Sequence, residues 1–258
     1  MGSYHLVDMH CHLDFMANAD AVAHDAAAKG LAIFANTVTP QGFEAAHATL
    51  AGASNVRVGV GLHPWWVADG RASWRDVERA TERARAARWV GEVGLDFSPA
   101  HVPAESEKLQ VDALRLVAQA CAEGAEATGP KLLSIHAVRS AQTVLDVLEE
   151  TGCLSSCHCI FHWFSGRSDE LHRAVKAGCS FSVNEMMLAT KRGREYARQV
   201  PVAQLLTETD LPPHGGEPFP ISEVIASLER TLDTLTAIRG TDVRERVAAN
   251  ALRLLDLA

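Results

Sequence analysis

The chain has 258 residues, of which 47% are hydrophobic and 22% are charged, and these are ordinary values for a globular protein. Its formal net charge of -8 argues against a protein that covers nucleic acid with a broad basic face. No run approaches the roughly 18 consecutive apolar residues of a membrane span, and no basic segment followed by an apolar core opens the chain. We therefore expect a cytoplasmic protein with no membrane partner.

Short apolar stretches alternate with helical patterns along the whole chain, and eight of them have the length and composition of strands. The predicted strands are Tyr4–Met9, Leu31–Asn36, Val56–Gly61, Trp89–Leu95, Lys131–His136, Cys159–Trp163, Cys179–Val183 and Gln204–Glu208. The predicted helices are Ala19–Lys29, Pro40–Ala53, Ser73–Arg88, Glu105–Thr128, Ala141–Glu150, Ser168–Ala177, Lys191–Arg198, Ile221–Arg239 and Asp242–Leu257.

This alternation predicts the fold class. Eight short strands separated by helices are typical of a TIM (β/α)₈ barrel in the α/β class. The sequence has no internal repeat and no linker, so we expect a single domain over residues 1–258. Ser73 is the predicted N-cap of its helix, and Asp242 with Glu245 predicts a capping box at the last helix.

Two histidines, His10 and His12, stand two residues apart at the end of the first predicted strand. Side chains two apart leave the same face of a strand, so both imidazoles would point to one place. Neutral imidazole binds zinc and similar ions, although such a pair also occurs by chance. Asp8 strengthens the metal hypothesis, because carboxylates near ligating histidines fix their tautomer and orientation.

Four more residues of metal-binding type lie at the ends of later predicted strands, namely Glu92, His136, His162 and Asp210. Each alone could be scaffolding, but barrel enzymes assemble their sites at the carboxyl ends of the strands. Four histidines and two carboxylates exceed what one tetrahedral zinc takes, so we expect two divalent metal ions, with zinc, magnesium and manganese left open.

The position of each residue suggests its role. Glu92 is expected to bridge the two ions, with His10, His12 and Asp210 on one and His136 with His162 on the other. A metal-bound water would lose its proton near neutral pH, and Asp210 would accept that proton as general base. Glu208 would orient the site from behind, or pair with a basic residue inside the barrel.

Further residues are expected to contact substrate. His63 ends the third predicted strand and is assigned to a phosphate or to the leaving oxygen. The aromatic candidates would stack on bases, unless they are merely packed against the fold: Trp65, Trp66, Trp163 and Phe164. The basic candidates would pair with phosphates, unless they are solvated charges: Arg139, Lys191 and Arg192.

Several motifs resemble those of the TatD family of metal-dependent deoxyribonucleases, in order and spacing: DMHCHLD, GLHP, VGEVGLD, FHWFSG and LLTETDLP. The resemblance spans nearly the whole chain. It implies a barrel of the metal-dependent hydrolase superfamily, the same six metal ligands, and phosphodiester hydrolysis, typically 3′-to-5′ exonuclease activity, with single-stranded DNA as the expected substrate. The HWFSG form and the HCHLDF opening are most similar to the TatD-like component of Qat anti-phage defence systems.

The expected substrate wall departs from that family. Val138 stands where the family usually has a phosphate-contacting arginine, and Arg139 comes one residue later. DNA, RNA, a nucleotide and another phosphoester therefore stay open. Two other functions are weighed: an amidohydrolase acting on a small-molecule amide or ester, and a non-catalytic assembly subunit. Glu92 in place of a bridging lysine disfavours the first, and six retained ligands disfavour the second.

Overall fold

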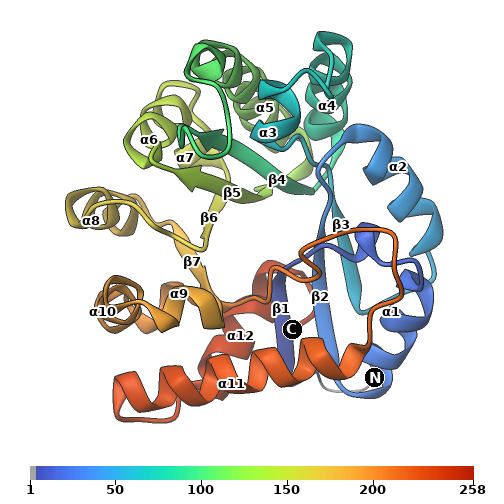
Figure 1. Cartoon of the computed structure of the whole chain (residues 1–258), viewed down its shortest axis with the longest axis vertical. Coiled ribbons are helices and arrows are strands. Elements are labelled where there is room, and N and C mark those ends of the chain that lie inside the picture. The colour runs from blue at the N-terminus through green and yellow to red at the C-terminus, as the bar shows by residue number, and fades with distance from the viewer. Residues whose placement is uncertain (1–3) are drawn as a thin grey trace.

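The computed structural model describes residues 4–258 and contains eight parallel strands surrounded by helices (Figure 1). Each strand overlaps one of the predicted strands. The first begins at Leu6 instead of Tyr4 and runs on through Cys11, so it includes His10. The strands are β1 (Leu6–Cys11), β2 (Leu31–Asn36), β3 (Val56–Gly59), β4 (Trp89–Asp96), β5 (Leu132–Val138), β6 (His158–His162), β7 (Ser180–Val183) and β8 (Leu205–Thr207).

The strands close into a barrel. They pair in chain order as two runs, β1 to β3 and β4 to β8. Backbone hydrogen bonds join the two runs at both edges. Leu62 N donates to Glu92 O at 3.0 Å just beyond β3, and Asp210 N donates to His10 O at 2.8 Å between β8 and β1. The predicted TIM barrel is confirmed.

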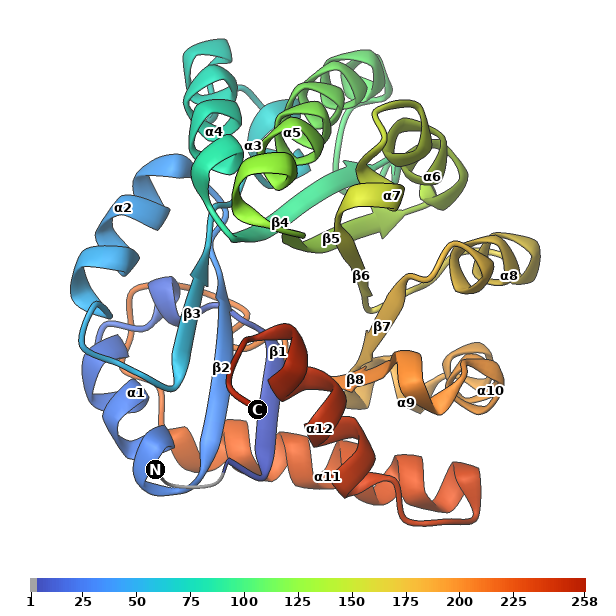
Figure 2. The same ribbon diagram turned by 180° about the vertical axis from the view of Figure 1, so that it is seen from behind.

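The helices form an outer ring (Figures 1 and 2). Three short helices, α3, α7 and α9, were not predicted, because four or five residues are too few to show a helical period. The helices are α1 (Ala19–Ala28), α2 (Pro40–Thr49), α3 (Pro64–Ala68), α4 (Trp74–Ala86), α5 (Glu107–Thr128), α6 (Ala141–Glu150), α7 (Cys153–Ser156), α8 (Ser168–Lys176), α9 (Glu185–Ala189), α10 (Lys191–Gln199), α11 (Ile221–Arg239) and α12 (Arg244–Leu254).

The two predicted helix starts have different outcomes. Ser73 is the N-cap of α4, and Asp76 accepts its backbone N–H at 2.9 Å, so that prediction is confirmed. The capping box at Asp242 is wrong, because α12 starts one residue later, with Val243 as N-cap. Asp242 instead accepts the N–H of Arg244 at 3.0 Å, a local turn that competes with a capping box.

The barrel is filled by apolar side chains near the N-terminal ends of its strands. Val7 and Leu132 form one cluster with Leu254 and Leu255, because α12 packs against β1 and β8 (Figure 2). A larger cluster fills the layer between strands and helices. The polar residues that end the strands therefore lie at the opposite, carboxyl end. Within residues 4–258, every helix is too short or too polar to cross a membrane.

Candidate metal centre

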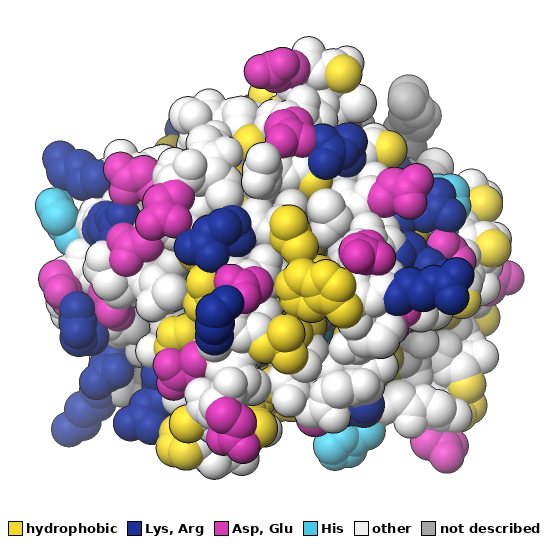
Figure 3. All heavy atoms as spheres, turned by 90° about the horizontal axis from the view of Figure 1, so that it is seen from above, with side chains coloured by type: hydrophobic (Ala, Val, Ile, Leu, Met, Phe, Trp, Pro, Cys, Tyr) yellow, Lys and Arg dark blue, Asp and Glu magenta, His cyan; other side chains and the backbone are white. Residues whose placement is uncertain are grey.

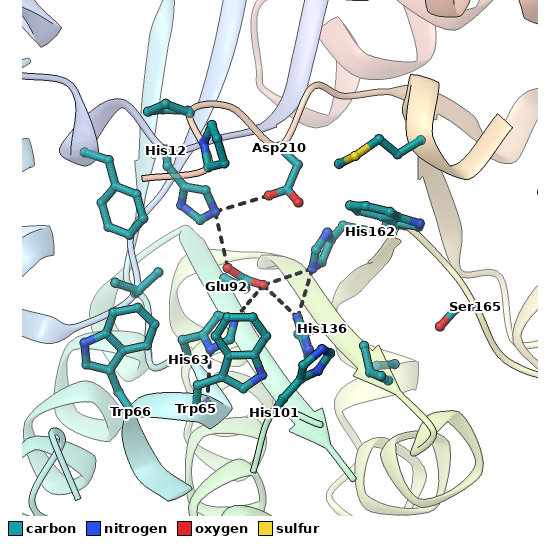
Figure 4. Close-up of a pocket in the computed structure, with 18 residues that line it drawn as sticks. His12, His63, Trp65, Trp66, Glu92, His101, His136, His162, Ser165 and Asp210 are labelled. Atoms are coloured by element: carbon teal, nitrogen blue, oxygen red, sulfur yellow. Dashed lines mark hydrogen bonds and ion pairs between the residues drawn. The ribbon is translucent and has the colours of Figure 1, made fainter. Parts of the chain in front are cut away.

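The carboxylate of Glu92 lies at the centre of the carboxyl-end cluster (Figure 4). Its Oε2 is 3.5 Å from the Nε2 atoms of both His10 and His12. Its Oε1 is 2.9 Å from His136 Nδ1 and 3.0 Å from His162 Nε2. All five side chains are buried. The two oxygens of one carboxylate thus face two separate pairs of imidazoles.

Asp210 completes the side that contains His10 and His12. Its Oδ1 is 3.3 Å from His12 Nε2 and 3.8 Å from His10 Nε2. Its backbone is left-handed, with φ of 60°, and Asp8 holds the neighbouring segment in place. The carboxylate of Asp8 accepts the N–H of Thr209 at 3.0 Å and its hydroxyl at 2.6 Å. Asp8 therefore fixes the backbone before Asp210. We expected Asp8 to orient an imidazole ring, but other residues make that contact.

Those orienting contacts come from residues that the sequence did not reveal. His12 Nδ1 donates to the backbone carbonyl of Asn36 at 2.8 Å, so Nε2 is the nitrogen that faces the cluster and that would bind a cation after losing its proton. His10 Nδ1 lies 2.7 Å from the hydroxyl of Ser134. His136 is turned the other way, with Nε2 3.2 Å from Asp96. Such partners fix the tautomer of a metal-ligating histidine.

The spacing of these atoms fits a divalent cation. Ligands of a tetrahedral metal with bonds of about 2.0–2.1 Å lie roughly 3.3–3.4 Å apart. The separations among His10, His12, Glu92 and Asp210 are 3.3 to 3.8 Å. His10 Nε2 is also buried without a hydrogen-bond partner among residues 4–258, and such an orphaned nitrogen calls for a partner.

The electrostatics favour the same conclusion. Burial raises the pKa of Glu92, but the imidazoles of His63 and His162 outweigh it and hold that pKa well below its usual range. Burial lowers the pKa of His12, but Asp210 and Glu92 raise it to about 9. Burial and the charge of His162 lower the pKa of His10 to about 4. The cluster thus places an ionised Glu92 carboxylate beside the protonated imidazole of His12. A bound cation would replace the proton of that imidazole.

His63 belongs to the cluster as a donor. Its Nδ1 accepts the N–H of Trp65 at 3.1 Å at the start of α3, so in the neutral ring Nε2 carries the proton. That Nε2 lies 3.1 Å from Glu92 Oε1. Burial lowers the pKa of His63, although Glu92 opposes this effect, so burial favours the neutral ring. A protonated Nε2 suits hydrogen bonding to an oxygen and not coordination of a metal.

Glu208 supports the centre from behind. Its Oε1 accepts the N–H of Trp163 at 3.1 Å and the amide of Asn184 at 2.9 Å, and it lies 3.8 Å from His162 Nδ1. Glu208 therefore contacts no lysine or arginine in the described chain. Trp163 has φ of 40°, an uncommon backbone conformation for a bulky residue, and such strain is concentrated at functional sites.

A cavity of about 480 Å³ opens over the centre. Most of its wall is apolar or aromatic. Trp65, Trp66 and Trp163 line it as predicted, together with His101, whose role the sequence did not suggest. Phe164 does not line it, because its ring is buried against the rings of Phe161, Phe181 and Tyr196.

The predicted cationic contacts lie outside this wall. Arg139, Lys191 and Arg192 are exposed, and none of them lines the cavity. The guanidinium of Arg192 lies 3.4 Å from the carbonyl of Ser165, a residue that lines the cavity. Across residues 4–258, no lysine or arginine belongs to the cavity wall.

Comparisons with known proteins agree with this geometry. The model of the family described as "TatD related DNase" matches residues 7–256. An uncharacterized metal-dependent hydrolase TatD of Mycobacterium tuberculosis is 30% identical, and the match covers 98% of each chain. A putative deoxyribonuclease TATDN3 of Mus musculus is 25% identical over 69% of this chain, and the match spans only 58% of the mouse protein.

A solved structure shows the same fold. The TatD homologue YJJV of Escherichia coli superposes with a TM-score of 0.78 at 20% identity, covering 98% of this chain and 97% of that one. The resemblance predicted from the motifs is confirmed. This chain belongs to the TatD-related DNase family of metal-dependent hydrolases.

Proposed function

We propose that this protein hydrolyses phosphodiester bonds of nucleic acid with two divalent cations, as a 3′-to-5′ exodeoxyribonuclease acting on single-stranded DNA. The observation that carries the proposal is the position of Glu92, whose two oxygens face separate pairs of imidazoles. A carboxylate placed in this way is suited to be shared by two cations. Relatives named as deoxyribonucleases support the substrate class.

Each cation has its own set of ligands in this proposal. His10, His12 and Asp210 would hold one, His136 and His162 the other, and Glu92 would contact both. Four imidazoles favour zinc over magnesium, which prefers oxygen ligands. Cations bound here would make a water molecule more acidic and would neutralise charge that develops on the phosphate.

The residues around the centre move the proton and position the phosphate. Asp210 Oδ1 faces His10 and His12, and Oδ2 has no hydrogen-bond partner among residues 4–258, so Oδ2 would accept the proton of the attacking water. His63 Nε2 would donate to an oxygen of the phosphate. Glu92 would stay ionised throughout, because its pKa is well below its usual range.

The cavity suits the terminal nucleotide of a strand. Its volume of about 480 Å³ lies within the range of small-ligand pockets, and its tryptophans offer flat surfaces on which a base would stack. Arg139, Lys191 and Arg192 lie outside the wall, so they would contact the strand beyond that nucleotide. The six free cysteines are in keeping with a reducing, cytoplasmic setting. A place in an anti-phage system stays a prediction.

End-labelled DNA tests the proposal. Single-stranded DNA labelled at the 3′ end and incubated with manganese or zinc should release labelled mononucleotide at once. The same strand labelled at the 5′ end should give a ladder that shortens with time. Chelator and the Glu92→Gln substitution should abolish both reactions. Internal cuts, or intact strands with a metal-loaded protein, would contradict the proposal.

One observation favours a second candidate, an amidohydrolase acting on a small-molecule amide or ester. A wall without lysine or arginine is well suited to an uncharged substrate. A panel of amides and lactones offered to the metal-loaded protein tests this function. Their hydrolysis, with DNA left intact, would favour the second candidate over the first.

A further inference from the structure

A second buried carboxylate, Asp96, lies at the end of β4 and is fully buried. Its Oδ1 accepts the N–H of Ser98 at 2.8 Å. Its Oδ2 accepts the indole N–H of Trp65 at 2.7 Å and lies 3.2 Å from His136 Nε2. The same oxygen lies 2.8 Å from Nδ1 of His101. Asp96 thus connects a metal-site histidine to a residue of the cavity wall.

His101 is placed by this contact at the edge of the cavity (Figure 4). Its side chain is 39% exposed, and its ring centroid lies 4.9 Å from that of Trp65. Because Asp96 accepts the proton on Nδ1, Nε2 is the remaining polar atom of the ring. Nε2 has no hydrogen-bond partner among residues 4–258.

His101 differs from the other histidines that line the cavity. The others have a ring nitrogen within 3.5 Å of Glu92 and are therefore held by the centre itself: His12, His63, His136 and His162. His101 instead lies on the loop after β4, bound to Asp96 and open to solvent. Among the described residues it is the cavity histidine that bonds to Asp96 and is partly exposed to solvent.

A proton donor at the cavity wall would assist hydrolysis of a phosphodiester. The leaving oxygen of a nucleoside departs as a strongly basic alkoxide unless it receives a proton as the bond to phosphorus breaks. Asp210 is assigned to removing a proton from the attacking water, and His63 to holding a phosphate oxygen. No other residue of the proposed mechanism supplies the proton for the leaving oxygen.

We propose that His101 is the general acid that protonates the leaving oxygen, with Asp96 as the residue that positions it; this inference rests on the proposed phosphodiesterase function. The water oxygen forms its bond to phosphorus while the bond from phosphorus to the leaving oxygen breaks. One proton of that water goes to Asp210, and the leaving oxygen takes the Nε2 proton of the His101 imidazolium. Asp210 then releases its proton to solvent and solvent restores the proton on His101, so one water is consumed and nothing is oxidised or reduced.

A comparison of leaving groups tests this role. The His101→Gln variant is assayed on a dinucleotide, whose leaving oxygen needs a proton, and on thymidine p-nitrophenyl phosphate, whose nitrophenolate leaves without one. We expect kcat on the dinucleotide to fall by about 10²- to 10⁴-fold, and kcat on the nitrophenyl ester to change by less than about threefold. His172→Gln, at an exposed histidine of α8, is the matched control and should leave both rates unchanged.

The other outcomes overturn the inference. Equal losses on both substrates would show that His101 serves binding or structure, and no loss on either would show that it has no role. Bound-metal content should be the same in wild type and His101→Gln, because His101 lies outside the ligand set. If wild type with metal hydrolyses neither ester, the proposed function itself fails, which is a different result from a failure of His101→Gln alone.

Discussion

Asp210 and His10 face the same point, but we expect their substitution to have different effects on bound metal and on activity. Asp210→Asn keeps an oxygen for the cation and removes the base, so we expect kcat to fall by about 10²- to 10⁴-fold with little change in bound metal. His10→Ala removes a buried ligand, so we expect one cation to be lost along with activity. Metal analysis and steady-state kinetics on both variants measure this. Full activity in either variant would remove that residue from the site.

The protons on the imidazoles give a pH prediction. The pKa of His12 is about 9 in the absence of a cation, so the ring is protonated at pH 7.5 and must lose that proton when metal binds. Apparent metal affinity should therefore rise with pH up to about 9 and level off above it. Calorimetry in two buffers of different ionisation enthalpy should find at least one proton released at pH 7.5. Binding without proton release would contradict this assignment.

At this scale the sequence predicted which residues converge better than it predicted the residues that support them. Five of the six ligand-type residues lie near or just after the carboxyl end of a strand, and Glu92 lies within β4. A barrel brings these positions together, so order along the chain was enough to group them. Ser134 and Asn36 support His10 and His12 through contacts between strands, which depend on register that a sequence does not show. His101 meets Asp96 through the path of a loop, although Asp96 stands in the VGEVGLD motif.

At the scale of elements, the closeness of β4 and β5 depends on Gly94. A Cβ at this position would lie 2.0 Å from the carbonyl oxygen of His136, and its φ is 148°. Gly94→Ala should therefore push β5 away, lower the free energy of unfolding by about 1–3 kcal/mol and weaken metal binding. Urea unfolding and metal content measure both effects. Gly52→Ala, where nothing lies within 4 Å, is the control and should change neither.

The alternation of strands and helices was predictable because buried strands and amphipathic helices have different periods. The short helices were not predictable from hydrophobic period. The start of α3 depends on its N-cap His63 and a proline, and the start of α9 depends on its N-cap Asn184. The start of α12 was wrong by one residue because an Asp can cap a helix or form its own turn. These errors lie at the ends of elements, where local hydrogen bonds decide the outcome.

At the scale of the whole molecule, charge predicts how the protein meets nucleic acid. The net charge is -8, and no lysine or arginine of residues 4–258 lines the cavity. The face formed by the helices at the top of Figure 1 carries basic and acidic side chains intermixed around a hydrophobic group (Figure 3). This face therefore offers no continuous basic track for the phosphates of a strand.

Activity on single-stranded DNA should therefore depend weakly on salt. Each phosphate contact contributes about -0.7 to the slope of log binding against log salt for single strands. We expect a slope of kcat/KM between about -0.7 and about -2.1, which corresponds to one to three contacts outside the wall by Arg139, Lys191 and Arg192. Arg192→Ala should bring the slope closer to zero. A slope of about -3 or steeper would show extensive contacts with the strand and contradict this account.

The most direct test of the central claim is a crystal structure of the metal-loaded protein with anomalous scattering recorded at the metal absorption edge. We predict two anomalous peaks, one on each side of the Glu92 carboxylate, the first among His10, His12 and Asp210 and the second beside His136 and His162. A single peak, or peaks away from Glu92, would contradict the account.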